Sequence, residues 1–205
     1  GLGMGFMITP WFKEVRPMAF HAIYVILIFA LLFNKNKHIK YFLYLWGVAI
    51  ILATLKGYIQ RNRGFDSAEM HWLMTGGATT HFIHSGIRYF SFFTDAANYG
   101  SNMAFSLVTY AICFLYEKNR FDKICWAVVA VAAGYGLMIS GTRTALIVAI
   151  SGFVLYTVLS KNVKLFLTSC AFLILAVGFL KFTTIGNGNQ FIRRMRTAFD
   201  PEDAS

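Results

Sequence analysis

The chain has 205 residues, of which 57% are hydrophobic and only 14% are charged, and its formal net charge is +10. Together with a mean hydropathy of +0.56, this composition excludes an ordinary soluble globular domain. We therefore predict an integral membrane protein.

Long apolar runs dominate the chain, and each has roughly the 20-residue length that a hydrocarbon core of about 30 Å requires of a helix. Because lipid offers no partner to free backbone groups, each run is predicted to be helical. The fold class is therefore all-α, a polytopic transmembrane helical bundle. The predicted spans, about six in number, are residues 17–33, 39–55, 97–116, 124–139, 144–159 and 163–182.

The orientation follows from the lysines and arginines in short links, which mark the cytoplasmic side. The links between spans one and two, three and four, and five and six carry most of the lysines and are predicted to be cytoplasmic. Residues 56–96 then form an outward-facing loop, and residues 183–205 begin a large outward-facing loop. Basic charge distributed in this way indicates membrane topology and argues against a nucleic-acid partner.

We expect the chain to be a single membrane domain that belongs to a larger protein. On the predicted topology residues 1–16 lie outside, yet they contain no signal peptide with a charged start and a cleavage site. The other end is polar and faces outward. We therefore expect at least one upstream span and further spans downstream.

The outward segment opens with a pattern typical of a helix start. Asp66 and Glu69 form a capping-box pattern, which predicts a short helix that Gly76 and Gly77 would end. Trp72 of this helix is expected to face lipid at the membrane interface.

Two histidines follow, His81 and His84, with a spacing that suits a metal if the segment is helical. No nearby cysteine or carboxylate completes a ligand set, so we predict no metal. Interfacial histidines, or hydrogen bonds to a polar substrate, are the favoured roles.

Residues 84–100, HSGIRYFSFFTDAANYG, place charge among aromatic rings directly before a span. Tyr89 and the neighbouring phenylalanines form either an interfacial aromatic belt or a wall for a sugar or isoprenoid. Asp95 and Asn98 begin the next helix, where capping is favoured over catalysis for Asp95. Arg88 precedes them and requires an anionic partner.

Arg143 lies in a turn of about four residues between two spans, which holds its charge at the membrane boundary. Thr142 can cap the outgoing helix, and the helix N-terminus adds a positive dipole end. These features predict an anion site. The alternative is an arginine that snorkels to lipid headgroups.

The fourth span contains a pattern of small residues, Ala130 and Gly134, which Gly136 extends. Such a pattern predicts close packing against a neighbouring helix. We assign it no chemistry.

Three motifs in order, IRYFSFFTDAANYG, SGTRTALIV and IRRMRTAFDPEDAS, resemble the O-antigen ligase and polymerase superfamily. The likeness extends from about Gly57 onward and is greatest to the O-antigen ligase family proteins of Bacteroidetes-type bacteria. It implies a GT-C-like glycosyltransferase of the bacterial inner membrane that needs no cofactor. Such enzymes transfer a glycan from undecaprenyl diphosphate to a sugar hydroxyl, on lipid A core or another repeat unit, at the periplasmic face.

The resemblance implies that Arg88 and Arg143 hold the diphosphate, with Arg196 as a weaker candidate. Substrate contacts are expected from His84, Tyr89, Asp95 and Asn98. The general base of the family lies in or after the large loop and cannot be assigned to His84. Two alternatives stay open: a transporter or flippase for an anionic lipid-linked solute, and a purely structural membrane subunit.

Overall fold

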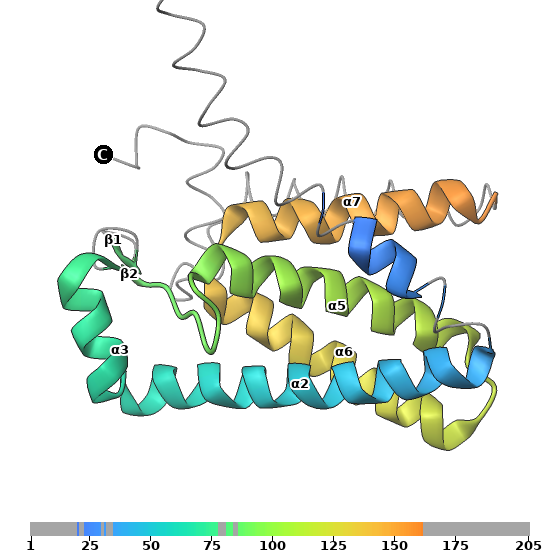
Figure 1. Ribbon diagram of the computed structural model, residues 1–205, viewed down its shortest axis with the longest axis horizontal. Coiled ribbons are helices and arrows are strands. Elements are labelled where there is room, and N and C mark those ends of the chain that lie inside the picture. The colour runs from blue at the N-terminus through green and yellow to red at the C-terminus, as the bar shows by residue number, and fades with distance from the viewer. Residues whose placement is uncertain are drawn as a thin grey trace, which may run out of the picture. The chain divides into compact units, whose positions relative to one another are not determined.

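The computed structural model describes residues 20, 23–29, 31, 35–77, 81–83 and 86–161, and the protein in these ranges is predominantly helical (Figure 1). The chain divides into two compact units, Gly1–Trp46 and Gly47–Ser205. The long helices are α2 (Asn36–Arg63), α5 (Ala96–Tyr116), α6 (Arg120–Ser140) and α7 (Arg143–Leu159).

The predicted all-α class is confirmed, and each of the four predicted spans between residues 39 and 159 coincides with a helix. Of the first predicted span, 17–33, residues 23–29 are helical. The sixth predicted span, 163–182, and the predicted outward loop, 183–205, lie outside the described residues.

Within the described residues, two helical stretches are long and apolar enough to cross a membrane, Lys37–Arg63 and Arg120–Ser140. Helix α7 is apolar but shorter. Helix α5 matches α6 in length but carries the amides of Asn98 and Asn102 in its first two turns. The bundle of about six spans therefore stays a prediction.

Helix α5 packs along both α6 and α7 (Figure 1). Its buried face presents Tyr99, Met103 and Tyr110. The buried residues opposite are small on α7, whereas α6 presents both large residues, such as Trp126 and Leu137, and small ones. Small side chains let helix backbones approach closely without a large apolar core between them. The small buried residues of the neighbouring helices are Ala133, Gly136, Ala145 and Ala149.

The second half of α2, from Gly47 onward, packs against α5 and α6. A Cβ added at Gly57 would lie 2.8 Å from the Tyr99 hydroxyl, and Thr54 donates a hydrogen bond to the Ala132 carbonyl at 3.2 Å. The predicted span ended at residue 55, but the helix continues to Arg63. It continues because the polar side chains of this extension find partners in the segment that follows.

That segment contains α3 (Ser67–Trp72), the π-helical turn η1 (Leu73–Gly77) and an antiparallel pair, β1 (Phe82–Ile83) with β2 (Gly86–Ile87). The predicted short helix and its capping box are confirmed. Asp66 accepts from the Glu69 backbone at 2.8 Å, and Glu69 accepts from the Asp66 backbone at 2.9 Å.

The loops of the second unit alternate between its two ends. Ser91 bonds to Ala53, and Gly100 packs against Ser140, so the segment after α2 and the α6–α7 turn lie at one end. At the other end the Tyr156 hydroxyl donates to the Tyr116 hydroxyl at 3.2 Å. This arrangement places the described loop around Ser91 and the Arg143 turn at the same end of the second unit.

Candidate functional site

Arg88, Asp95 and Arg143 share one electrostatic environment, which we call the arginine site. Burial lowers the pKa of the half-buried Arg88 guanidinium, Asp95 opposes this effect, and Arg143 adds to it. Arg88 lies between β2 and α5, and its backbone N–H donates to the His81 carbonyl at 3.0 Å. The fold therefore brings together two arginines that are far apart in sequence.

Arg143 occupies the first position of α7 because the turn before it is very tight. Helix α6 ends at Gly141, whose left-handed backbone (φ 59°) suits glycine, and Thr142 is the N-cap of α7. The predicted cap by the Thr142 side chain is wrong, since that side chain makes no capping hydrogen bond. Its buried hydroxyl instead lies 3.1 Å from the Ser140 hydroxyl.

The N-terminal end of α7 consequently carries partial positive charge at the arginine site. Backbone N–H groups in the first turn of a helix have no intrahelical partner, and the helix dipole places positive charge there. Because the Thr142 side chain makes no capping hydrogen bond, it does not neutralise this end. Arg143 adds a full charge at the same place.

Asp95 is the N-cap of α5, which confirms the predicted preference for capping. One carboxylate oxygen accepts from the Asn98 backbone at 2.7 Å, and the other accepts from the Asn98 side chain at 2.8 Å. Asn98 also donates to the Thr94 hydroxyl at 3.0 Å. The carboxylate thus orients the exposed Asn98 amide beside the arginine site.

Tyr89 lies in a different environment from Arg88. Its ring packs on Phe65 at 5.9 Å, and its pKa is raised by burial, lowered by Arg61 and raised by Tyr135. Tyr89 therefore shares its electrostatic environment with Arg61.

The predicted site residues His84 and Arg196 lie outside the described residues.

The aromatic residues of the segment between α2 and α5 pack on one another. Phe90 stacks on Phe65 at 5.4 Å, and it contacts Trp72 at 5.2 Å and His81 at 5.0 Å. Trp72 was expected to face lipid. Its side chain is 41% exposed, but it also contacts His81 and so belongs to this cluster.

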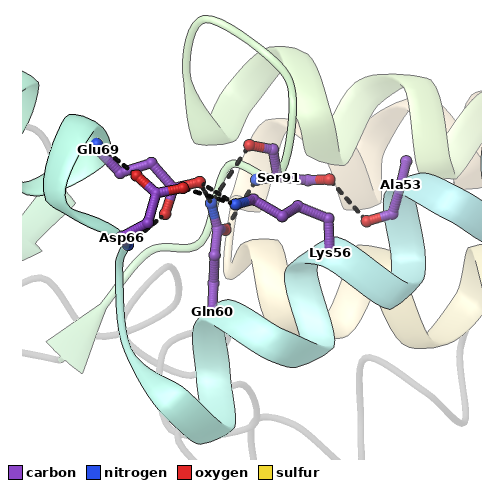
Figure 2. A network of polar contacts seen from close by, with 6 residues as sticks. All are labelled: Ala53, Lys56, Gln60, Asp66, Glu69 and Ser91. Carbon is purple, nitrogen blue, oxygen red and sulfur yellow. Dashed lines mark hydrogen bonds and ion pairs between the residues drawn. The ribbon is translucent and has the colours of Figure 1, made fainter.

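A polar network that the sequence did not predict joins α2 to the segment between α2 and α5 (Figure 2). Lys56 Nζ lies 2.7 Å from Glu69 and 2.9 Å from Asp66. Gln60 Nε2 donates to the same Glu69 carboxylate at 2.9 Å. Gln60 also binds the backbone of Ser91, whose hydroxyl donates to the Ala53 carbonyl at 2.6 Å.

The described part of the chain contains no group of three or more histidine, cysteine, aspartate or glutamate residues placed to hold a metal ion. Two of the cysteines, Cys113 and Cys125, are free thiols within α5 and α6.

No protein-family model matches the chain, and neither a curated protein nor a solved structure matches it.

Proposed function

We propose that this protein is a multi-pass glycosyltransferase of the O-antigen ligase and polymerase type in the bacterial inner membrane. It would transfer a glycan from undecaprenyl diphosphate to a sugar hydroxyl of lipid A core or of a repeat unit at the periplasmic face. The observation that carries the proposal is the shared electrostatic environment of Arg88 and Arg143, one of them half-buried.

The chemistry of the arginine site suits a diphosphate. Two guanidinium groups and one carboxylate share the site's electrostatic environment, so positive charge is in excess, and arginine's planar fork matches phosphate oxygens bidentately. In glycosyl transfer, negative charge grows on the leaving phosphate as the bond from sugar to oxygen breaks. Preorganised donors in a partly dry site stabilise that charge more than they stabilise the bound substrate.

The surface of the helices supports a membrane setting for this chemistry. Large apolar side chains point outward along the helices, among them Leu52, Phe105, Val131 and Ile147. In water such a surface would drive aggregation, whereas lipid covers it at no cost. We propose that the bundle crosses the membrane several times, with the arginine site at the periplasmic boundary.

The proposal is tested with Arg88→Lys and Arg143→Lys in the intact protein. Lysine keeps the charge but loses the fork, and removal of one preorganised donor typically lowers a rate by about 10²–10³-fold. Blots of lipopolysaccharide should therefore show loss of glycan transfer at normal protein levels in the membrane. Arg120→Lys, at an exposed position at the opposite end, is the matched control and should transfer normally. Normal transfer by both site variants would refute the proposed roles.

Transport of an anionic lipid-linked solute is the second candidate, and one observation favours it. Asn98 and Asn102 are exposed on α5, and carboxamides facing outward from a span suit a hydrophilic passage better than lipid. Purified protein in liposomes separates the two functions. An enzyme forms glycan linked to the acceptor, whereas a transporter moves the lipid-linked donor to the other leaflet without forming product.

A further inference from the structure

We infer that Gln60 is a positioning residue for the arginine site, because its carboxamide binds the backbone of Ser91 within the loop that carries Arg88 and Asp95. The identity of the ligand rests on the proposed function. The positioning itself rests on the geometry of the network in Figure 2.

The contact between Gln60 and Ser91 is a pair of hydrogen bonds that run in opposite directions. Gln60 Nε2 donates to the Ser91 carbonyl at 3.2 Å, and the Ser91 N–H donates to Gln60 Oε1 at 2.9 Å. We call this pair the Gln60–Ser91 clamp. Gln60 is 1% exposed and Ser91 is 3% exposed, so water cannot replace either bond when it breaks.

Ser91 requires such a clamp because its backbone is strained. Its φ of +55° lies in the left-handed region, which residues with a Cβ rarely adopt unless surrounding contacts hold them there. Ser91 lies in a turn between Arg88 and Asp95 that is closed by a bond from the Phe93 N–H to the Phe90 carbonyl at 3.0 Å. Loss of the clamp would let Ser91 return to an ordinary conformation and would move both charged residues.

The clamp is in turn held by α2 and α3. Glu69 accepts from the same Gln60 amide at 2.9 Å and pairs with Lys56, so the carboxamide cannot rotate freely. The Ser91 hydroxyl adds a bond to the Ala53 carbonyl. The position of the Arg88 loop is thus set by one face of α2, formed by Ala53, Lys56 and Gln60.

Distance measurements between spin labels test the positioning without reference to activity. Labels at Phe92→Cys and Thr144→Cys, both exposed positions, report the Arg88 loop against the start of α7 in intact protein whose three native cysteines are replaced by alanine. The parent should give one narrow distance distribution, and Gln60→Ala should broaden it. Asn62→Ala is the control, because the bond that Asn62 makes among the described residues stays within α2, to the Tyr58 carbonyl, and it should leave the distribution narrow.

Gln60→Glu keeps the size of the side chain and so tests the clamp without creating a cavity. A carboxylate cannot donate to Ser91 and repels Glu69, whereas a protonated carboxyl can donate again. The distribution should be broad at a pH where the new carboxyl is ionised and should narrow where it is protonated; burial and the neighbouring Glu69 place that transition at a raised pH. A distribution that stays narrow in Gln60→Ala, or in Gln60→Glu at a pH where the new carboxyl is ionised, would overturn the inference.

Binding of inorganic pyrophosphate to the same proteins separates this inference from the proposed function. Gln60→Ala should weaken binding about tenfold or more, since misplacement of a site by about 1 Å is sufficient for such losses. If the parent binds no pyrophosphate while the label distances respond to Gln60, the positioning holds and the diphosphate assignment fails. Unchanged pyrophosphate affinity in Gln60→Ala would refute the positioning role.

Discussion

Single glycines at the helix contacts determine how closely α5 approaches α6 and the α6–α7 turn. A Cβ at Gly100 would meet the Thr142 hydroxyl and would lie 2.6 Å from the Ser140 hydroxyl, and one at Gly136 would lie 2.8 Å from Met103. At Gly134 the nearest atom would be 3.8 Å away. The close contact predicted for Gly134 is therefore made by Gly136, which lies on the face of α6 toward α5.

Gly100→Ala should destabilise the protein, because a methyl group has no room between α5 and the buried hydroxyls of the α6–α7 turn. Overpacking of this kind typically costs about 1–3 kcal/mol. Thermal unfolding of the intact protein in detergent should show a lower midpoint for Gly100→Ala. Gly134→Ala is the matched control and should unfold at or above the parent temperature, because its methyl group fits and alanine favours the helix. Equal midpoints for the two variants would contradict the contact at Gly100.

The residues whose roles the sequence predicted correctly are those that act on partners only a few positions away in the chain. Asp66 and Asp95 each cap a helix through partners three residues away, and such patterns are visible in the chain itself. The Gln60–Ser91 clamp spans 31 positions and has no sequence signature. Thr142 matched the capping pattern, but the proximity of Ser140 gave its hydroxyl another neighbour.

At the level of elements, α3 depends on contacts at its first turn. A six-residue helix is too short to be stable by itself in water. Its capping box satisfies two backbone groups, and Lys56 of α2 pairs with both acidic residues of that box. The helix is therefore attached to the end of α2 through its N-terminus.

The stability of α3 should consequently depend on pH through Asp66. The pKa of Asp66 is lowered, first by the hydrogen bond from the Glu69 backbone and then by that from Lys56, relative to an ordinary value of 3.8. A depressed folded-state pKa contributes stability that is complete above the ordinary value and is lost as the pH falls through the folded-state value. Hydrogen exchange of the α3 amides, corrected for intrinsic rates, should therefore show falling protection as the pH drops below about 4.

Asp66→Asn provides the comparison for this titration. Asparagine can still accept the capping bond but carries no charge, so protection should be lower at neutral pH and should vary less as the pH falls. A parent protein whose α3 protection is constant from pH 6 to the acid limit of folding would exclude a contribution from the Asp66 carboxylate.

A comparison of the predicted span ends with the observed helix ends shows which helices the hydropathy of the sequence can locate. The predicted spans 97–116 and 144–159 agree closely with α5 and α7 because apolar runs there end at polar turns. The end of α2 was predicted too early because Lys56 interrupts the apolar run. The helix continues since Lys56 and Gln60 are satisfied by α3 and Ser91, and a hydropathy pattern contains no information about such partners.

At the scale of the whole molecule, both ends of the second unit carry basic residues, with Arg120 near the lysines of one end and Lys56 in the network beside the arginine site. Lys118 and Lys123 lie near the Tyr116–Tyr156 contact, where Lys123 rests over the Phe114 ring at 4.9 Å. Arg88 and Arg143 lie at the opposite end. Arginine binds anions through its planar fork, so the pairing of Arg88 with Arg143 at one end fits our proposal that this end is periplasmic and the other cytoplasmic.

Labelling of single cysteines tests this orientation in the intact protein. Thr94→Cys lies beside the arginine site and Lys118→Cys lies at the other end, and both positions are exposed. In a background without native cysteines, a membrane-impermeant maleimide should label Thr94→Cys in right-side-out spheroplasts and Lys118→Cys in inverted vesicles. The two ends must differ because a bundle that crosses the membrane has each loop on one side only. If both positions label from the same side, the α5 helix between them does not cross the membrane. The arginine site and the lysines at the other end of α5 then lie on one side of the membrane, which contradicts the proposed periplasmic and cytoplasmic ends.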